Sequence, residues 1–97
     1  MEERLLRFAS PTLYQKMIEA FSTYHLHPYD VYGTLTKKGD VMVVTLRFSA
    51  DYTQEETIFL QESQLTYPDE AVEQFFLKVA EKCKSLLVTD YFNMTKG

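Results

Sequence analysis

Apolar residues recur every three or four positions along the first part of the chain, which is the spacing of one face of a helix. Ser10 followed by Pro11 has the form of an N-cap residue with proline at the first helical position. Pro28 disfavours helical backbone at the residue before it. The pattern therefore predicts a helix over about residues 11–25. Its apolar face carries Leu13, Met17, Ala20, Phe21 and Tyr24.

The apolar period changes to two in the middle of the chain, where β-branched and aromatic residues alternate with polar ones. This alternation is typical of strands that bury one face. It predicts three antiparallel strands, over residues 31–37, 41–50 and 56–62. We expect a five-residue loop, Asp51–Glu55, between the second and third strands.

The two turns between these strands set the expected register. Lys38 and Gly39 are expected to form a two-residue hairpin loop, because this choice keeps apolar residues opposite one another on one face. Phe59 then points to the other face of the sheet. The expected pairs are Leu35 with Met42, Gly33 with Val44, Val31 with Leu46, Ile58 with Phe48 and Leu60 with Leu46.

A second helix is predicted to begin after Thr66, which has the character of a capping residue. Pro68 suits a first helical turn, and Asp69 and Glu70 complement the positive end of the helix dipole. An apolar stripe then continues for about 20 residues, and we expect the helix to fray after Val88. The stripe comprises Val72, Phe75, Phe76, Val79, Cys83, Leu86 and Leu87.

The length of 97 residues suits one small domain. We expect an α+β fold in the order α-β-β-β-α, a three-stranded antiparallel meander with two helices packed on one face. Within the single domain of residues 1–97, residues 1–10 form an N-terminal arm or an extra helical turn, residues 11–89 the core, and residues 90–97 a C-terminal tail. The expected buried residues are Met17, Phe21, Val31, Leu35, Val44, Leu46, Phe48, Ile58, Leu60, Val72, Phe75, Phe76, Val79, Cys83 and Leu86.

Charge and composition narrow the classes of partner. Fourteen acidic and ten basic residues give a formal net charge of −4, the wrong sign for a protein that binds by neutralising phosphates. We therefore expect no nucleic-acid partner. No stretch approaches the ~18 apolar residues of a membrane span, so we expect no membrane partner. The single cysteine, Cys83, cannot form an internal disulfide, which favours a reducing, cytoplasmic location.

The order of helix, three antiparallel strands and helix between Pro11 and Val88 is similar in topology to that of double-stranded RNA-binding domains. The resemblance implies that both helices pack on one sheet face and leave the other face open. Those domains place a run of lysines at the start of the second helix, whereas this chain has Pro68-Asp69-Glu70 there, which would repel phosphates. The resemblance therefore implies the architecture without RNA binding.

Residue types able to perform chemistry are scattered along the chain. His25 and His27 could both reach one metal ion, but a metal site usually has three or four ligands. Cys83 falls in the apolar stripe of the second helix, where it is expected to be a small buried hydrophobic residue. The acidic residues within 51–56 match no calcium-binding loop. We therefore expect no catalytic residue, cofactor or metal, and not an enzyme.

The sheet face that points away from the helices is more apolar than contact with water requires, and aromatic residues with an arginine are enriched at protein interfaces. We expect a small cytosolic, non-enzymatic interaction or regulatory module that binds a protein partner or itself as a homodimer. It acts through this open face, a sheet edge or the aromatic tail. The expected interaction surface is Tyr32, Val41, Val43, Arg47, Phe59, Tyr91 and Phe92.

Two further expectations concern the edges and the interior of the sheet. Glu56 and Glu62 discourage pairing at the edge of the third strand, which makes the first strand the better candidate for joining another sheet. The alternative function is a small-ligand-binding protein or minor enzyme with a tyrosine-lined pocket between the first helix and the sheet. Gly33 leaves a gap on the inner face that a helix side chain fills or a ligand enters.

Overall fold

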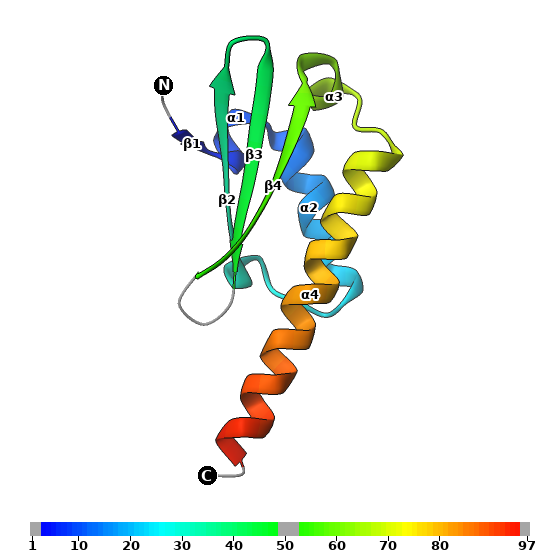
Figure 1. Ribbon diagram of the computed structural model, residues 1–97. Helices are drawn as coiled ribbons and strands as arrows, with labels where there is room; N and C mark the ends of the chain where they lie inside the picture. Colours follow the sequence, from blue (N-terminus) through cyan, green and yellow to red (C-terminus); the bar gives the residue numbers. More distant parts are fainter. Residues whose placement is uncertain (1–2, 49–52, 96–97) are drawn as a thin grey trace.

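The protein folds as a four-stranded antiparallel sheet, in the order β1-β2-β3-β4, with its helices on one face (Figure 1). This computed structural model describes residues 3–48 and 53–95, and for residues 89–95 it describes the backbone alone. The strands are β1 (Glu3–Leu5), β2 (Val31–Lys38), β3 (Val41–Phe48) and β4 (Gln54–Gln61). The helices are α1 (Leu6–Ala9), α2 (Pro11–Thr23), the 3-10 helix η1 (Pro28–Asp30), α3 (Glu62–Thr66) and α4 (Glu70–Thr95). The predicted α+β class is confirmed, and the predicted number of three strands is wrong.

The additional strand comes from the N-terminal segment, which pairs with the edge of β2. Leu5 lies opposite Thr34, and the chain turns into α1 at the next residue. Leu6 is fully buried, and a Cβ built on Gly33 would lie 3.3 Å from its Cδ2 atom. Leu6 and Leu46 together therefore fill the gap expected at Gly33. Residues 1–10 were expected to be an arm or a helical turn, and their described part contains both a strand and a turn of helix.

The hairpin between β2 and β3 turns at Gly39 and Asp40, one residue later than predicted. Gly39 has a φ of 60°, a positive value that glycine adopts readily because it has no Cβ. Moving a two-residue turn by one position shifts the register by two residues, so Leu35 lies opposite Val44 instead of Met42. Because the shift is even, the same side chains face the helices as predicted.

The register between β3 and β4 also differs from the predicted register, by four residues. Strand β4 begins at Gln54, before the predicted start at residue 56. Ile58 lies opposite Val44 instead of Phe48, and Glu55 belongs to the strand instead of the predicted loop. This shift is again even, and Phe59 points away from the helices as predicted. Asp51 of the predicted acidic loop lies outside the described residues.

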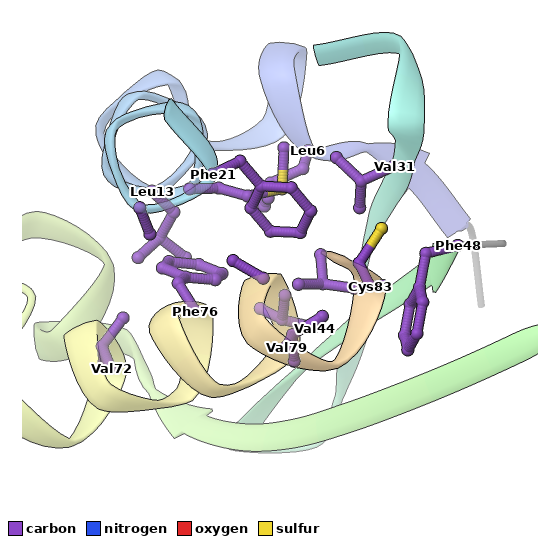
Figure 2. Close-up of a cluster of buried hydrophobic side chains, with 14 of the residues drawn as sticks. Leu6, Leu13, Phe21, Val31, Val44, Phe48, Val72, Phe76, Val79 and Cys83 are labelled. Carbon is purple, nitrogen blue, oxygen red and sulfur yellow. The ribbon is translucent and has the colours of Figure 1, made fainter. Parts of the chain in front are cut away.

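The core lies between the inner face of the sheet and the helices α2 and α4 (Figure 2). Figure 2 shows Leu6 of α1, Phe21 of α2, Val44 of β3 and Cys83 of α4 within one cluster of buried side chains. The Cys83 thiol donates a hydrogen bond to the Asp30 carbonyl oxygen at 3.9 Å and is buried, which confirms its expected packing role. Three predicted core residues are only half-buried, namely Ile58, Phe75 and Leu86. The core also contains residues beyond the prediction, namely Leu6, Leu13, Ala20, Leu26, Met42 and Ala80.

Capping residues define the starts of the two long helices. The Ser10 hydroxyl accepts a hydrogen bond from the Leu13 amide at 3.4 Å, which confirms the predicted start of α2. At α4 the cap is Asp69, whose Oδ1 atom accepts from the Val72 amide at 3.1 Å. Thr66, the predicted cap, instead ends the short helix α3.

Helix α4 continues to Thr95 without the break that we expected after Val88. A helix of 26 residues is about 39 Å long at 1.5 Å per residue. This length exceeds that of the eight-residue strands, and Figure 1 shows the C-terminal part of α4 extending beyond the sheet. Residues 90–95 therefore continue the helix, and do not form a separate tail.

We expect Phe76→Ala to lower the free energy of unfolding by roughly 3–5 kcal/mol, because Phe76 is fully buried and its removal leaves a cavity. Phe75→Ala should cost less than half as much, because Phe75 already contacts water. Urea unfolding of both variants measures the difference. Equal losses in the two variants would contradict the observed orientation of α4.

Leu6→Ala tests whether the N-terminal segment belongs to the core. We expect a loss of roughly 2–5 kcal/mol of unfolding free energy, the usual cost of truncating a buried leucine. The matched control is Phe8→Ala in the same short helix, where the ring is 64% exposed and the expected loss is below about 1 kcal/mol. A Leu6→Ala variant as stable as the control would show that the segment does not pack on the sheet.

Candidate interaction surface

Five of the seven residues predicted to form an interaction surface lie on the outer face of the sheet, which points away from the helices. Strand alternation places them there, because their neighbours along each strand are the buried residues of the inner face. Phe59 is 68% exposed, Tyr32 and Val41 are exposed, and the other two are half-buried. The five residues are Tyr32, Val41, Val43, Arg47 and Phe59.

The register divides these five residues into two groups. Val43 lies directly opposite Phe59, and Val41 precedes Val43 by two residues on β3, so these three form an apolar cluster near the β2–β3 hairpin. Tyr32 lies opposite Arg47 toward the other end of the strands. Four residues separate Val43 from Arg47 along β3, which is about 13 Å. We call Val41, Val43 and Phe59 the apolar cluster.

A row of threonines separates the two groups. Thr34, Thr45 and Thr57 lie opposite one another on β2, β3 and β4. The hydroxyls of Thr45 and Thr57 are 3.5 Å apart, and the Thr34 hydroxyl donates to Glu3 Oε2 at 3.1 Å. Thr34 and Thr45 are buried on the outer face, where Tyr32 and Leu5 lie beside Thr34, and Val43 and Arg47 flank Thr45. The hydroxyl groups are thus satisfied within the sheet.

The aromatic residues of the predicted tail, Tyr91 and Phe92, lie in the last turns of α4. The backbone there belongs to the part of the helix that extends beyond the sheet (Figure 1). Their side chains lie outside the described part of the structure. The structure therefore does not bring these two residues into the same surface as the apolar cluster.

The edge preference inferred from the sequence is wrong. Strand β1 covers the edge of β2 from Thr34 to Thr36, the edge that we expected to be free. Within residues 3–48 and 53–95, β4 pairs with β3 alone and keeps its other edge open. Glu56 was expected to discourage pairing at that edge, but its Oε1 atom accepts a hydrogen bond from Lys82 Nζ of α4 at 2.8 Å. Both side chains of this ion pair are partly exposed, so it contributes at most about 1 kcal/mol.

The two histidines have a local structural role. The His27 Nδ1 atom accepts a hydrogen bond from the Tyr29 amide at 3.3 Å, and the His27 amide donates to Asp30 Oδ2 at 2.7 Å. The His27 ring also stacks on Tyr29, with ring centroids 4.6 Å apart. His25 has a φ of 60° and is exposed. Among the described residues, no three or more His, Cys, Asp or Glu side chains gather in a group that could hold a metal ion.

Sequence reasoning missed a cavity at the hairpin end of the inner sheet face. It has a volume of about 530 Å³ and lies between the ends of β2 and β3 and the helices α1 and α3. Arg4 lines this cavity because β1 pairs with β2. The sequence around Arg4 has no clear apolar period, so it did not predict this strand. A different cavity, between α2 and α4, contains a tyrosine, Tyr24. The cavity that contains Tyr24 therefore lies between two helices, whereas the predicted tyrosine-lined pocket was placed between the first helix and the sheet.

None of the helices in the described residues is both long enough and apolar enough to cross a membrane. The surface thus offers an apolar cluster, a polar row with Tyr32 and Arg47, an open strand edge and a cavity with basic residues at its rim. Comparison of the chain with protein-family models, curated proteins and solved structures finds no match.

Proposed function

We propose that this protein is a small cytosolic, non-enzymatic interaction module that forms a homodimer through the outer face of its sheet. The observation that carries the proposal is the position of Phe59, which is 68% exposed directly opposite Val43. No element covers this face within the described chain. Exposed apolar clusters with polar surroundings are typical of protein-binding surfaces.

The size of the face supports a second copy of the chain as the partner. Three strands have eight residues and β1 has three, so the face has a flat area of roughly 400 Å². Two such faces, with the relief of their side chains, bury a total near the lower limit of about 1,000 Å² for a specific interface. This area suits a weak, concentration-dependent homodimer.

The distribution of side chains also suits a two-fold interface, in which the same patch of both copies meets. The apolar cluster would pack against its own copy, as in two sheets stacked about 10 Å apart. Tyr32, Arg47 and Glu55 lie opposite one another across the strands and provide a polar rim. The threonine row already has its hydrogen bonds, so its burial leaves few hydroxyl groups unsatisfied.

The non-enzymatic part of the proposal rests on where the reactive residue types lie. Cys83 is packed in the core, and His27 caps the 3-10 helix η1. These side chains therefore serve the fold. The middle of the outer face carries the rings of Tyr32 and Phe59 and the Arg47 side chain, residue types that are enriched at protein interfaces.

Phe59→Glu tests the proposal. We expect wild-type protein to shift from monomer to dimer across the micromolar range, and Phe59→Glu to weaken the dimer at least tenfold, roughly 1.4 kcal/mol, because the carboxylate would be buried. Light scattering coupled to size exclusion measures both. The matched control is Gln15→Glu, which adds the same charge at an exposed position of α2, on the opposite side of the molecule from the outer face of the sheet.

The control should retain most of the dimer, and circular dichroism should show that both variants are folded. Wild-type protein that remains a monomer at all concentrations would contradict the proposal. Equal weakening in both variants would attribute the effect to net charge and not to the apolar cluster.

A further inference from the structure

The cavity at the hairpin end of the inner face differs in charge from the cavities that α4 lines. Arg4 and Lys37 are its charged lining residues, and no Asp or Glu lines it. The cavity between β4 and α4, by contrast, contains Glu56 and Glu81 together with two lysines. The charged residues of this cavity are both positive, whereas the chain as a whole has a net charge of −4.

The sheet holds the two cations close together. Arg4 lies opposite Leu35, and Lys37 follows two residues along β2 on the same face. Such diagonal neighbours have Cα atoms about 7–8 Å apart, within reach of one another for long side chains. Neither cation forms an ion pair within the described residues. A single anion between them would relieve their repulsion and bind both.

The rest of the lining is mostly apolar. Leu35 and Met42 form the floor and are almost fully buried, and Leu65 of α3 and Ala9 of α1 form the sides. The volume of about 530 Å³ falls within the range of about 300–1,000 Å³ that is typical of small-ligand sites. The cavity thus joins a cationic rim to an apolar interior.

We propose that this cavity binds an amphiphilic anion, a carboxylate or phosphate monoester attached to a medium-length alkyl chain. Arg4 and Lys37 bind the head group, and the alkyl chain lies on Leu35, Met42 and Leu65. The head group requires charge, and the chain requires apolar surface, so neither a simple anion nor a neutral alcohol satisfies the site. This ligand site lies on the inner side of the sheet and is independent of dimerisation through the outer face.

An NMR titration of the full chain with decanoate, below its micelle concentration, tests the site. We expect the amide signals of Leu35, Gly39, Met42 and Leu65 to shift. Decanol should bind roughly tenfold more weakly, because it lacks the charge, and acetate should leave the signals unchanged. Decyl phosphate in a parallel titration shows which head group binds more tightly. Equal binding of decanol and decanoate, or shifts confined to the outer face, would overturn the proposal.

Lys37→Glu should weaken decanoate binding roughly tenfold, because it places a like charge at the rim. The matched control is Lys38→Glu, the next residue on β2, which changes the net charge equally but points to the outer face. Lys37 is exposed, so its substitution does not disturb the core. Binding that is unchanged in Lys37→Glu, or weakened as much in Lys38→Glu, would overturn the assignment of this cavity.

Discussion

The contact between Leu6 and Gly33 is the constraint on which the arrangement of the sheet edge depends. The missing side chain of Gly33 leaves room for Leu6, and the buried leucine fixes the N-terminal segment against β2. Strand β1 then becomes one edge strand of the sheet, and β4 is the edge strand at the other side in the described chain. The same pairing sets Arg4 beside the basic cavity. The small size of Gly33 thus accommodates the N-terminal segment that adds β1 to the sheet and places Arg4 near Lys37.

The sequence pattern was sufficient for the element types and faces, but not for the register. Alternation is unchanged by an even shift, so the buried faces of β2, β3 and β4 could be predicted while the paired residues could not. The difference matters for the surface, because the predicted register would place Phe59 opposite Arg47, whereas the observed register places it opposite Val43. The apolar cluster is therefore a consequence of register. The turn at Gly39 depends on its positive φ, which periodicity does not reveal.

Short elements were hard to predict for a related reason. Strand β1 has three residues and α1 has four, so neither is long enough to show a period. Tertiary contacts stabilise both, as the burial of Leu6 shows. Thr66 and Asp69 are both suitable N-cap residues for α4 in the sequence. Thr66 is the last residue of the short helix α3, so Asp69 caps α4. The basic cavity could not be found in advance, since its lining comes from five elements spread along the chain from Arg4 to Leu65.

The order of strands in the sheet has a consequence for how the protein folds. Each neighbour in the sheet is also the next strand in the chain, and only two residues connect β2 to β3. Pairing of β2, β3 and β4 therefore closes short loops at little entropic cost. Strand β1 is different, because residues 6–30, including all of α2, separate it from β2. We expect the three-stranded meander to form early in the folding reaction and the N-terminal strand to dock last, after α2 has supplied the surface that receives Leu6.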